Sequence, residues 1–302
     1  MDSLSEADED ALERSMTDLH PLDVAAATSA LLEVKQVLDD LGVVFYLEEG
    51  TCLGAVREGG FIPWDDDVDL ASVFGLHGFT EDSIPLIVAA LRERGFITKV
   101  IQQPHGVYIP ALKSSIRVDW HARRIVDGST FHYPGVRIPA RLFENLKEID
   151  FIGEQFLVPD PPEEFLRFKY GPDWRTPKPD TYGEDVVKLI PAKPIPGVPN
   201  RLRQAITTHL LRWRAARIRV LDHRGEPVAG AELVIAGVGR WRTNRDGYAR
   251  FFVSNARFHA LVVKYEGHEE VLYEEKFVRG GNYVYRPNPS STAGRIMALT
   301  LS

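Results

Sequence analysis

The sequence predicts an α+β chain of two folded parts: a mixed sheet with flanking helices, followed by an antiparallel β-sandwich domain. The chain has 302 residues, and a domain takes roughly 100–200 residues. Its first two thirds alternate stretches of helical apolar spacing with short β-rich runs. From Ile218 onward, apolar and polar residues alternate in several short runs separated by turns, which is typical of a sandwich.

The first part has clear helix boundaries. Residues 1–20 hold seven acids and one arginine and are predicted to form an acidic flexible tail. Apolar residues at helical spacing, each stretch followed by a glycine suited to end a helix, predict three helices. They are Leu22–Leu41, Thr80–Arg94 and Pro161–Tyr170, and a short buried strand is expected at Val43–Leu47.

The rest of the chain divides by composition. We expect a catalytic domain over 21–199, whose proline-rich end Pro172–Pro199 is an irregular arm or a linker. A connecting helix follows over 200–217, and the sandwich occupies 218–302. The stretch Arg201–Arg219 has six arginines and no acid. It is either a solvated connecting helix or one that attaches the protein peripherally to an anionic membrane.

Composition narrows the class of protein. The net charge is −7, most of it in the first twenty residues, so the nearly neutral body argues against nucleic-acid binding. The single cysteine, Cys52, excludes an internal disulfide or a cysteine zinc site. There is no signal-like start and no apolar run of the roughly 20 residues that a membrane span needs. The expected location is cytoplasmic, or the inner membrane face if the basic helix binds there.

The densest chemical signal is the stretch EEGTCLGAVREGGFIPWDDDVDL, which runs from Glu48 to Leu70. Gly50 and Thr51 follow a strand where a helix can begin, a geometry that offers backbone N–H groups and a hydroxyl to a phosphate. If the aspartates lie on a strand, Asp65, Asp67 and Asp69 share one face.

Such carboxylates repel one another unless a cation lies among them. Mg²⁺ or Mn²⁺ suits oxygen ligands and commonly binds substrate phosphates as well. A calcium loop of the EF-hand type is not supported, because its glycine and final glutamate are absent at the required positions. A solvated acidic loop is the simpler alternative, but the interleaved Trp64 and Val68 and the upstream Gly-Thr pair count against it.

This stretch resembles the LicD family (LicD/fukutin-related nucleotidyltransferase-fold phosphotransferases). The matching positions are Gly50, Thr51, Leu53–Arg57, Gly60–Asp67 and Asp69. A later segment, Tyr170–Pro177, is similar to the family's YGxDWxxP element. The resemblance spans about residues 25–195 and leaves out the C-terminal part.

The resemblance implies a nucleotidyltransferase-like fold and a set of roles. Gly50 and Thr51 would hold nucleotide phosphates, and Asp67 and Asp69 would bind divalent metal together with Asp65. Asp119, on an alternating strand about 50 residues further on, is the candidate third carboxylate and would also orient the acceptor proton.

Two more side chains are candidates for substrate binding. Arg57 would neutralise phosphate charge and Trp64 would stack on a base or sugar, although a surface arginine and a core tryptophan remain open readings. The basic residues near Asp119 are read as solvated or, less simply, as phosphate ligands; they are Lys113, Arg117, Arg123 and Arg124.

The implied activity is metal-dependent transfer of a substituted phosphate, such as phosphocholine or ribitol phosphate, from a CDP-linked donor. The acceptor would be a glycan or lipid-linked glycan hydroxyl, in polysaccharide or glycoconjugate modification. Two alternatives stay open. One is a true nucleotidyltransferase that releases pyrophosphate, and the other is a non-catalytic glycan- or protein-binding protein with a degenerate transferase domain.

The C-terminal part resembles carboxypeptidase-regulatory-like, immunoglobulin-like modules. Its glycines and aspartates are mostly turn residues, so the match speaks of fold more than of function. The matching positions are Asp222, Gly225, Pro227, Gly230, Ala231, Thr243, Asp246, Gly247 and Ala249.

Overall fold

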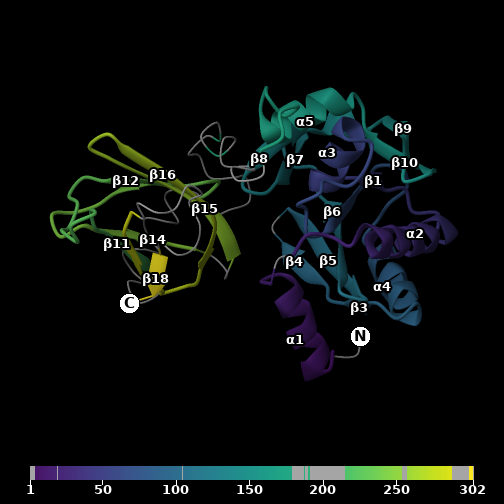
Figure 1. Cartoon of the computed structure of the whole chain (residues 1–302), viewed down its shortest axis with the longest axis horizontal. Helices are drawn as coiled ribbons and strands as arrows, with labels where there is room; N and C mark the ends of the chain where they lie inside the picture. Colours follow the sequence, from purple (N-terminus) through teal and green to yellow (C-terminus); the bar gives the residue numbers. More distant parts are fainter. Residues whose placement is uncertain are drawn as a thin grey trace. The chain divides into compact units, whose positions relative to one another are not determined.

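A computed structural model describes residues 4–18, 20–103, 105–178, 187, 190, 215–253, 257–287 and 299–301. The described chain forms two compact units (Figure 1). Unit 1 comprises Met1–Phe131 and Arg137–Lys169, and unit 2 comprises His132–Val136 and Tyr170–Ser302.

Unit 1 is built on a mixed sheet in the order β1-β2-β6-β5-β3, with β4 paired to β5. The neighbours β2 and β6 run parallel and the other pairs antiparallel. The strands are β1 (Tyr46–Leu47), β2 (Val68–Val73), β3 (Ile97–Thr98), β4 (Ile101–Gln103), β5 (Gly106–Lys113) and β6 (Ile116–Arg123). The sequence prediction of a mixed sheet with flanking helices is confirmed.

Helices cover this sheet because each has one apolar face. Helix α2 lies beside α4, and both contact strands of the sheet (Figure 1). The Asp23 carboxylate caps α2 by accepting the Ala26 N–H at 3.0 Å, and the helix ends before Gly42, whose φ of +65° suits glycine. The helices of unit 1 are α1 (Glu6–Ser15), α2 (Val24–Asp40), α3 (Glu49–Arg57), α4 (Ser83–Glu93) and α5 (Pro162–Tyr170). The three predicted helices correspond to α2, α4 and α5.

Two hairpins and one short helical turn complete the first half of the chain. They are β7 (Ser129–His132) with β8 (Val136–Pro139), β9 (Leu146–Phe151) with β10 (Glu154–Pro159), and the 3₁₀ turn η1 (Ala140–Phe143). Strand β10 lies against β1, and the core of the unit includes Phe156, Trp120 and Leu70.

The acidic N-terminus is not a flexible tail over its whole length, because ten of its residues form α1. The Ser5 hydroxyl oxygen accepts the Asp8 N–H at 3.2 Å, acids occupy the first turn, and Leu12 is 2% exposed. Acidic side chains near a helix N-terminus favour the helix dipole. The acidic residues that indicated a flexible tail are therefore also suited to the first turn of a helix.

Unit 2 contains two four-stranded sheets that share one hydrophobic core. One sheet has the order β14-β11-β17-β18 and the other β13-β12-β15-β16. The core draws on both, for example Ile218 and Phe251 from the first and Leu233 and Leu261 from the second. The strands are β11 (Ala216–Val220), β12 (Glu232–Ile235), β13 (Gly239–Arg242), β14 (Tyr248–Phe251), β15 (Arg257–Tyr265), β16 (His268–Phe277), β17 (Asn282–Tyr285) and β18 (Leu299–Leu301).

Two expectations for this half need revision. The arrangement is not wholly antiparallel, because β11 and β17 pair in parallel. The predicted connecting helix over 200–217 lies outside the described residues except at its end, where Ala216 and Arg217 belong to strand β11. Most of the arm Pro172–Pro199 also lies outside them.

Candidate active site

Strands β2 and β6 bring three aspartates together. The parallel pairing sets Asp69 directly beside Asp119, and Asp67 lies just before β2 begins. Carboxylate oxygens of these three residues lie within 4.8 Å of one another. Asp69 is 8% and Asp119 6% exposed. We call Asp67, Asp69 and Asp119 the acid cluster, and its convergence from separate strands agrees with the sequence prediction.

Burial and mutual repulsion favour protons on these carboxyls. Burial is the main cause that raises the pKa of Asp69 well above its usual value, and Asp67, Glu49 and Asp119 raise it further. Burial also raises the pKa of Asp119, to about 7, although Arg117 acts against it. Carboxyls arranged in this way bind either protons or a cation at neutral pH.

Arg117 is the cation that this site itself supplies. Its Nε donates to both Asp119 oxygens at 3.1 Å, and its Nη2 donates to Asp67 and, at 3.4 Å, to Asp66. Its Nη1 donates to the Ser15 carbonyl oxygen at the end of α1. The guanidinium is 6% exposed.

Sequence reasoning treated Arg117 as a solvated residue or a phosphate ligand, and the structure corrects this. The signal was present, because Arg117 and Asp119 are two apart on one strand and so point to the same face. Tyr108, on the adjacent strand β5, was also missed; its hydroxyl donates to Asp119 Oδ2 at 2.9 Å.

Asp65 is not part of a strand, contrary to the prediction. Strand β2 begins only at Val68, so strand alternation does not place Asp65 beside Asp67 and Asp69. It lies in the preceding loop, where Asp65, Asp66 and Asp67 form a second group with oxygens within 4.8 Å. Burial, then Asp67 and Asp66, raise the pKa of Asp65 well above its usual value.

The loop holds Asp65 against the first turn of α3. A Cβ built on Gly50 would lie 2.3 Å from Asp65 Oδ2, so only glycine permits this approach. A carboxylate at this position meets the positive end of the helix dipole. Gly50 thus has a steric role beside the carboxylates, in the same place where the sequence predicted a phosphate turn.

Thr51 ties α3 to strand β2. Its hydroxyl oxygen accepts the Asp69 N–H at 2.8 Å, and the residue is 1% exposed. The structure therefore brings Gly50 and Thr51 to the acid cluster. The buried Thr51 positions Asp69 through this hydrogen bond to its backbone.

The other two predicted substrate residues are Arg57, at the end of α3, and Trp64, in the loop before β2. Arg57 is in the last turn of α3, and its Nε pairs with Glu58 Oε1 at 2.7 Å. Nine helical residues span roughly 13 Å, so Arg57 stands at the helix end away from Gly50. Trp64 is half-buried in the loop just before Asp65.

A second set of buried charges lies at the start of α3, where Glu48 precedes the helix and Glu49 is its first residue. Glu48 is fully buried and accepts from Arg123 Nε at 3.1 Å and from Arg123 Nη2. Arg123 Nη2 also lies 3.6 Å from Glu49 Oε1, and Lys169 pairs with Glu49 Oε2. We call Glu48, Glu49, Arg123 and Lys169 the ion-pair group. It shows that Arg123 is neither solvated nor a free phosphate ligand.

The donor set of the acid cluster fits a hard divalent cation. All its atoms are carboxylate oxygens, the type that Mg²⁺ and Mn²⁺ prefer. Asp66, Asp67 and Asp119 pair with the Arg117 guanidinium, and Asp65 and Asp69 lie beside these carboxylates, which leaves negative charge that a bound metal would balance.

Comparisons with known proteins match the part of the chain that carries this site. Residues 42–160 match a family model described as "LicD/FKTN/FKRP, nucleotidyltransferase domain". A stretch of 64 residues, 21% of this chain, is 44% identical to mouse (Mus musculus) "Ribitol-5-phosphate transferase FKTN" and covers 13% of that protein. A stretch of 144 residues, 45% of this chain, is 29% identical to "Ribitol 5-phosphate transferase FKRP" of mouse and of human (Homo sapiens), covering 29% of each.

The chain thus spans less than a third of the length of these relatives. Among solved structures, "ANT(2")-Ia in complex with adenylyl-2"-tobramycin" matches with a TM-score of 0.26 and 15% identity. That match covers 37% of this chain and 67% of the other. Within the described residues, no helix is both long and apolar enough to cross a membrane.

Proposed function

We propose that the chain transfers a substituted phosphate from a CDP-linked donor to a glycan hydroxyl, with Mg²⁺ or Mn²⁺ as cofactor. The observation that carries the proposal is the convergence of Asp69 on β2, Asp119 on the parallel strand β6 and Asp67 just before β2, inside the segment that matches the family model. The relatives named for ribitol phosphate transfer support the class of reaction, since stretches of 64 and 144 residues of this chain align with them.

Asp67 and Asp69 would hold the metal, with Asp119 as third ligand and Asp65 at the edge. A bound divalent metal would stabilise negative charge on the phosphate group during its transfer and would lower the pKa of a bound hydroxyl. Asp119 would orient the acceptor hydroxyl and receive its proton. The Tyr108 hydroxyl supports this role, because it donates to Asp119 Oδ2 at 2.9 Å and so fixes the carboxylate.

Arg117 would change partners during the cycle. Without metal its guanidinium neutralises Asp67 and Asp119. If a metal bound by the aspartates were to balance their charge, the Arg117 guanidinium would be suited to a donor phosphate, because its forked N–H groups match phosphate oxygens. Arg117 would then be a phosphate ligand, one of the two readings that the sequence left open for it.

The experiment that tests the function is a thermal-shift panel followed by product analysis. CDP-ribitol, CDP-choline, CDP-glycerol, CTP, UTP and ATP are each added with Mn²⁺. A ligand at about 100 times its dissociation constant stabilises by roughly 2.7 kcal/mol. We expect a metal-dependent shift with one CDP conjugate and CMP release when a glycan acceptor is added.

Each other outcome selects an alternative. Pyrophosphate release from CTP would replace the proposal with a nucleotidyltransferase. No shift with any nucleotide would favour a binding protein with a degenerate transferase domain. We further propose that unit 2 is an immunoglobulin-like β-sandwich of the carboxypeptidase-regulatory-like kind, supported by the two sheets that share one core.

A further inference from the structure

One outer face of unit 2 is rich in arginine. On β11 the side chains of Ile218 and Val220 enter the core, so Arg217 and Arg219 point to the opposite face. On the neighbouring strand β14, Tyr248 and Arg250 alternate in the same way with buried Ala249 and Phe251. We call Arg217, Arg219, Tyr248 and Arg250 the arginine face.

The register of the two strands sets like charges against each other. Arg217 is directly opposite Arg250, and Arg219 is opposite Tyr248. Like charges in directly opposed positions destabilise a sheet. Among the described residues, none of the three arginines forms an ion pair with a carboxylate. An arrangement that costs stability and has no internal counter-charge is suited to an anion from outside.

Tyr248 holds two of the guanidinium groups in place. The Arg217 guanidinium carbon lies 4.8 Å from the centre of the Tyr248 ring, and that of Arg219 lies 5.2 Å from it. Cation–π contact of this kind limits the freedom of both side chains. In addition, Arg219 Nε is buried and has no hydrogen-bond acceptor within the described part of the chain. The positive charge is therefore preorganised.

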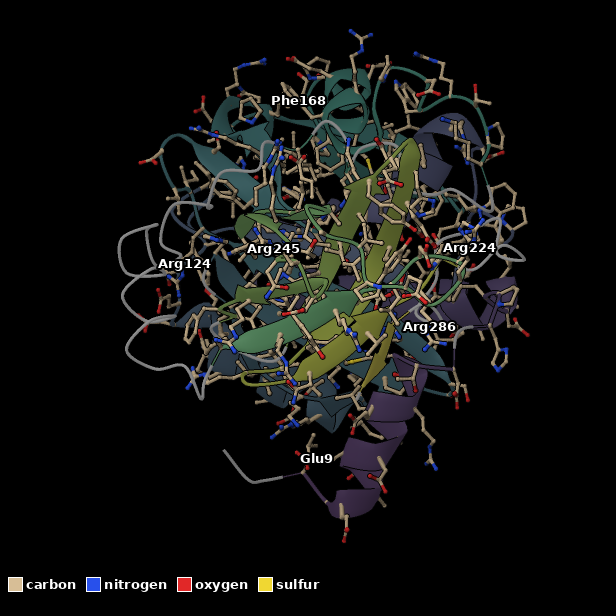
Figure 2. The ribbon with its side chains drawn as sticks, turned by 90° about the vertical axis from the view of Figure 1, so that its left-hand side faces the viewer. Glu9, Arg124, Phe168, Arg224, Arg245 and Arg286 are labelled. Atoms are coloured by element: carbon tan, nitrogen blue, oxygen red, sulfur yellow. The ribbon has the colours of Figure 1, made fainter. Side chains whose placement is uncertain are left out.

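A cavity of about 340 Å³ opens on this face. Its lining consists of Arg217, Asn244, Asp246, Tyr248 and Arg250. Its floor is the β11–β14 pair, and its wall is the turn between β13 and β14, which also presents Arg245 to solvent (Figure 2).

The wall supplies neutral and negative groups as well as positive ones. Asn244 Oδ1 accepts the backbone N–H groups of Asp246 at 3.0 Å and Tyr248 at 2.9 Å, so the turn is rigid. With Oδ1 engaged, the Asn244 amide can offer its N–H groups to a ligand oxygen. The Asp246 carboxylate can accept the hydrogen of a ligand hydroxyl, and it disfavours a ligand that is anionic along its whole length.

We propose that this cavity binds a phosphorylated sugar or polyol unit. Arg217 and Arg250 would hold the phosphate with their forked N–H groups, while Asn244 and Asp246 would bind hydroxyl groups. One anionic group beside several hydroxyls satisfies the lining, whereas a nucleic acid or an anionic lipid surface would set further phosphates against Asp246. The site is in unit 2 and does not depend on the activity proposed for unit 1.

The test is calorimetric titration of the full chain in EDTA, so that no metal site contributes. The probes are ribitol 5-phosphate and glucose 6-phosphate, with ribitol, glucose and inorganic phosphate as the matching fragments. At least one phosphorylated probe is expected to bind more tightly than both of its fragments. Arg250→Gln and Arg217→Gln should each weaken that binding about tenfold, which is about 1.4 kcal/mol, since each removes a charged hydrogen bond to the phosphate.

Asp246→Asn should change the binding affinities of two probes in opposite directions. It should weaken binding of the phosphorylated probe, because a hydroxyl acceptor is altered, and strengthen binding of inorganic phosphate, because a repulsive charge is removed. The control is Arg242→Gln, an exposed arginine of the other sheet that lies 3.6 Å from Glu232. It should leave binding unchanged.

Three results would overturn the proposal. The first is no binding of either phosphorylated probe at millimolar concentration. The second is inorganic phosphate binding as tightly as the phosphorylated probes, which would reduce the cavity to an unspecific anion site. The third is Arg250→Gln and Arg242→Gln having the same effect. Since Arg250 is exposed and opposed to another arginine, its variant should keep or raise the melting temperature, which checks that it folds.

Discussion

The acid cluster and the ion-pair group both lie near the start of α3, and they differ in charge balance. In the ion-pair group two carboxylates, Glu48 and Glu49, meet two cations, Arg123 and Lys169. Around the acid cluster, one guanidinium, that of Arg117, pairs with three aspartates, Asp66, Asp67 and Asp119. Burying charge costs free energy unless each charge is paired. The balanced group is therefore complete within the protein, whereas the acid cluster is suited to an external cation.

The pKa directions follow the same division. Burial works to lower the pKa of the Arg123 guanidinium, but Glu48 raises it above its usual value, so the guanidinium stays charged. For Asp69, burial and neighbouring carboxylates act in the same direction and raise the pKa. Charge balance, more than burial, distinguishes a structural cluster of this protein from a candidate catalytic one.

The strongest test of the comparison is Asp69→Asn. The amide keeps the shape but removes one metal ligand, so transfer should fall at least about a thousandfold. The melting temperature should stay the same or rise, because carboxylate repulsion is relieved. Transfer assays and thermal unfolding measure the two effects. A variant that unfolds would mean that the acid cluster is structural and would contradict the comparison.

Arg123→Met should lower stability, whereas Asp69→Asn should not. It leaves Glu48 buried without its cation, which should lower the free energy of unfolding by about 3–5 kcal/mol. Denaturant unfolding measures the loss, and Mn²⁺ should not restore it. Adding Glu48→Leu should recover much of the stability. The neighbouring Arg124→Gln breaks a solvent-accessible pair with Glu81 and a contact of Arg124 with the Phe74 ring, and it should cost less than about 1 kcal/mol.

Arg117→Gln should make stability depend on metal. Removing the guanidinium should lower the free energy of unfolding by about 2 kcal/mol, less than for Arg123 because the carboxyls can take up protons instead. Mn²⁺ should then stabilise the variant more than the parent protein. Arg92→Gln is the control, since Arg92 bonds the side-chain and backbone oxygens of Thr98. An equal Mn²⁺ response in both variants would refute the role of Arg117.

The smallest effect concerns pH in the absence of metal. Asp119 has a pKa of about 7 in the folded protein, and its ordinary value is 3.8. At a pH between these two values the folded state therefore binds more protons than the unfolded state. Stability should therefore decline as pH rises from about 4 to 7 and then level off. In Asp119→Asn the decline should be shallower. Melting curves in EDTA compare the two proteins, and identical slopes would rule out this contribution.

The sequence predicted the members of the acid cluster better than their surroundings. Asp67, Asp69 and Asp119 could be identified because they sit in a distinctive motif and on an alternating strand. The place of Asp65 could not, because the first residue of a strand depends on tertiary pairing. The partners Arg117–Asp67 and Arg123–Glu48 are 50 and 75 residues apart in sequence, and periodicity carries no information about contacts of that range.

The fold shows the same limit. Local patterns predicted α2 and α4 and the series of strands in unit 2. They did not predict that β11 and β17 run parallel, because strand direction is set by long-range topology. Helix α1 was missed because an acidic stretch suits both a solvated tail and a capped helix, and the buried contact of Leu12 decides between them.

The parallel register of β2 and β6 has a consequence for which changes this sequence can tolerate. Val68 through Val73 pair one to one with Val118 through Arg123, with Asp69 beside Asp119. Adding or deleting one residue within either strand would turn its following side chains to the other face of the sheet. Insertions in the turns between β2 and β6 leave the pairing intact. Natural length variation should therefore collect in those turns, while the spacing from Asp67 to Asp69 stays fixed.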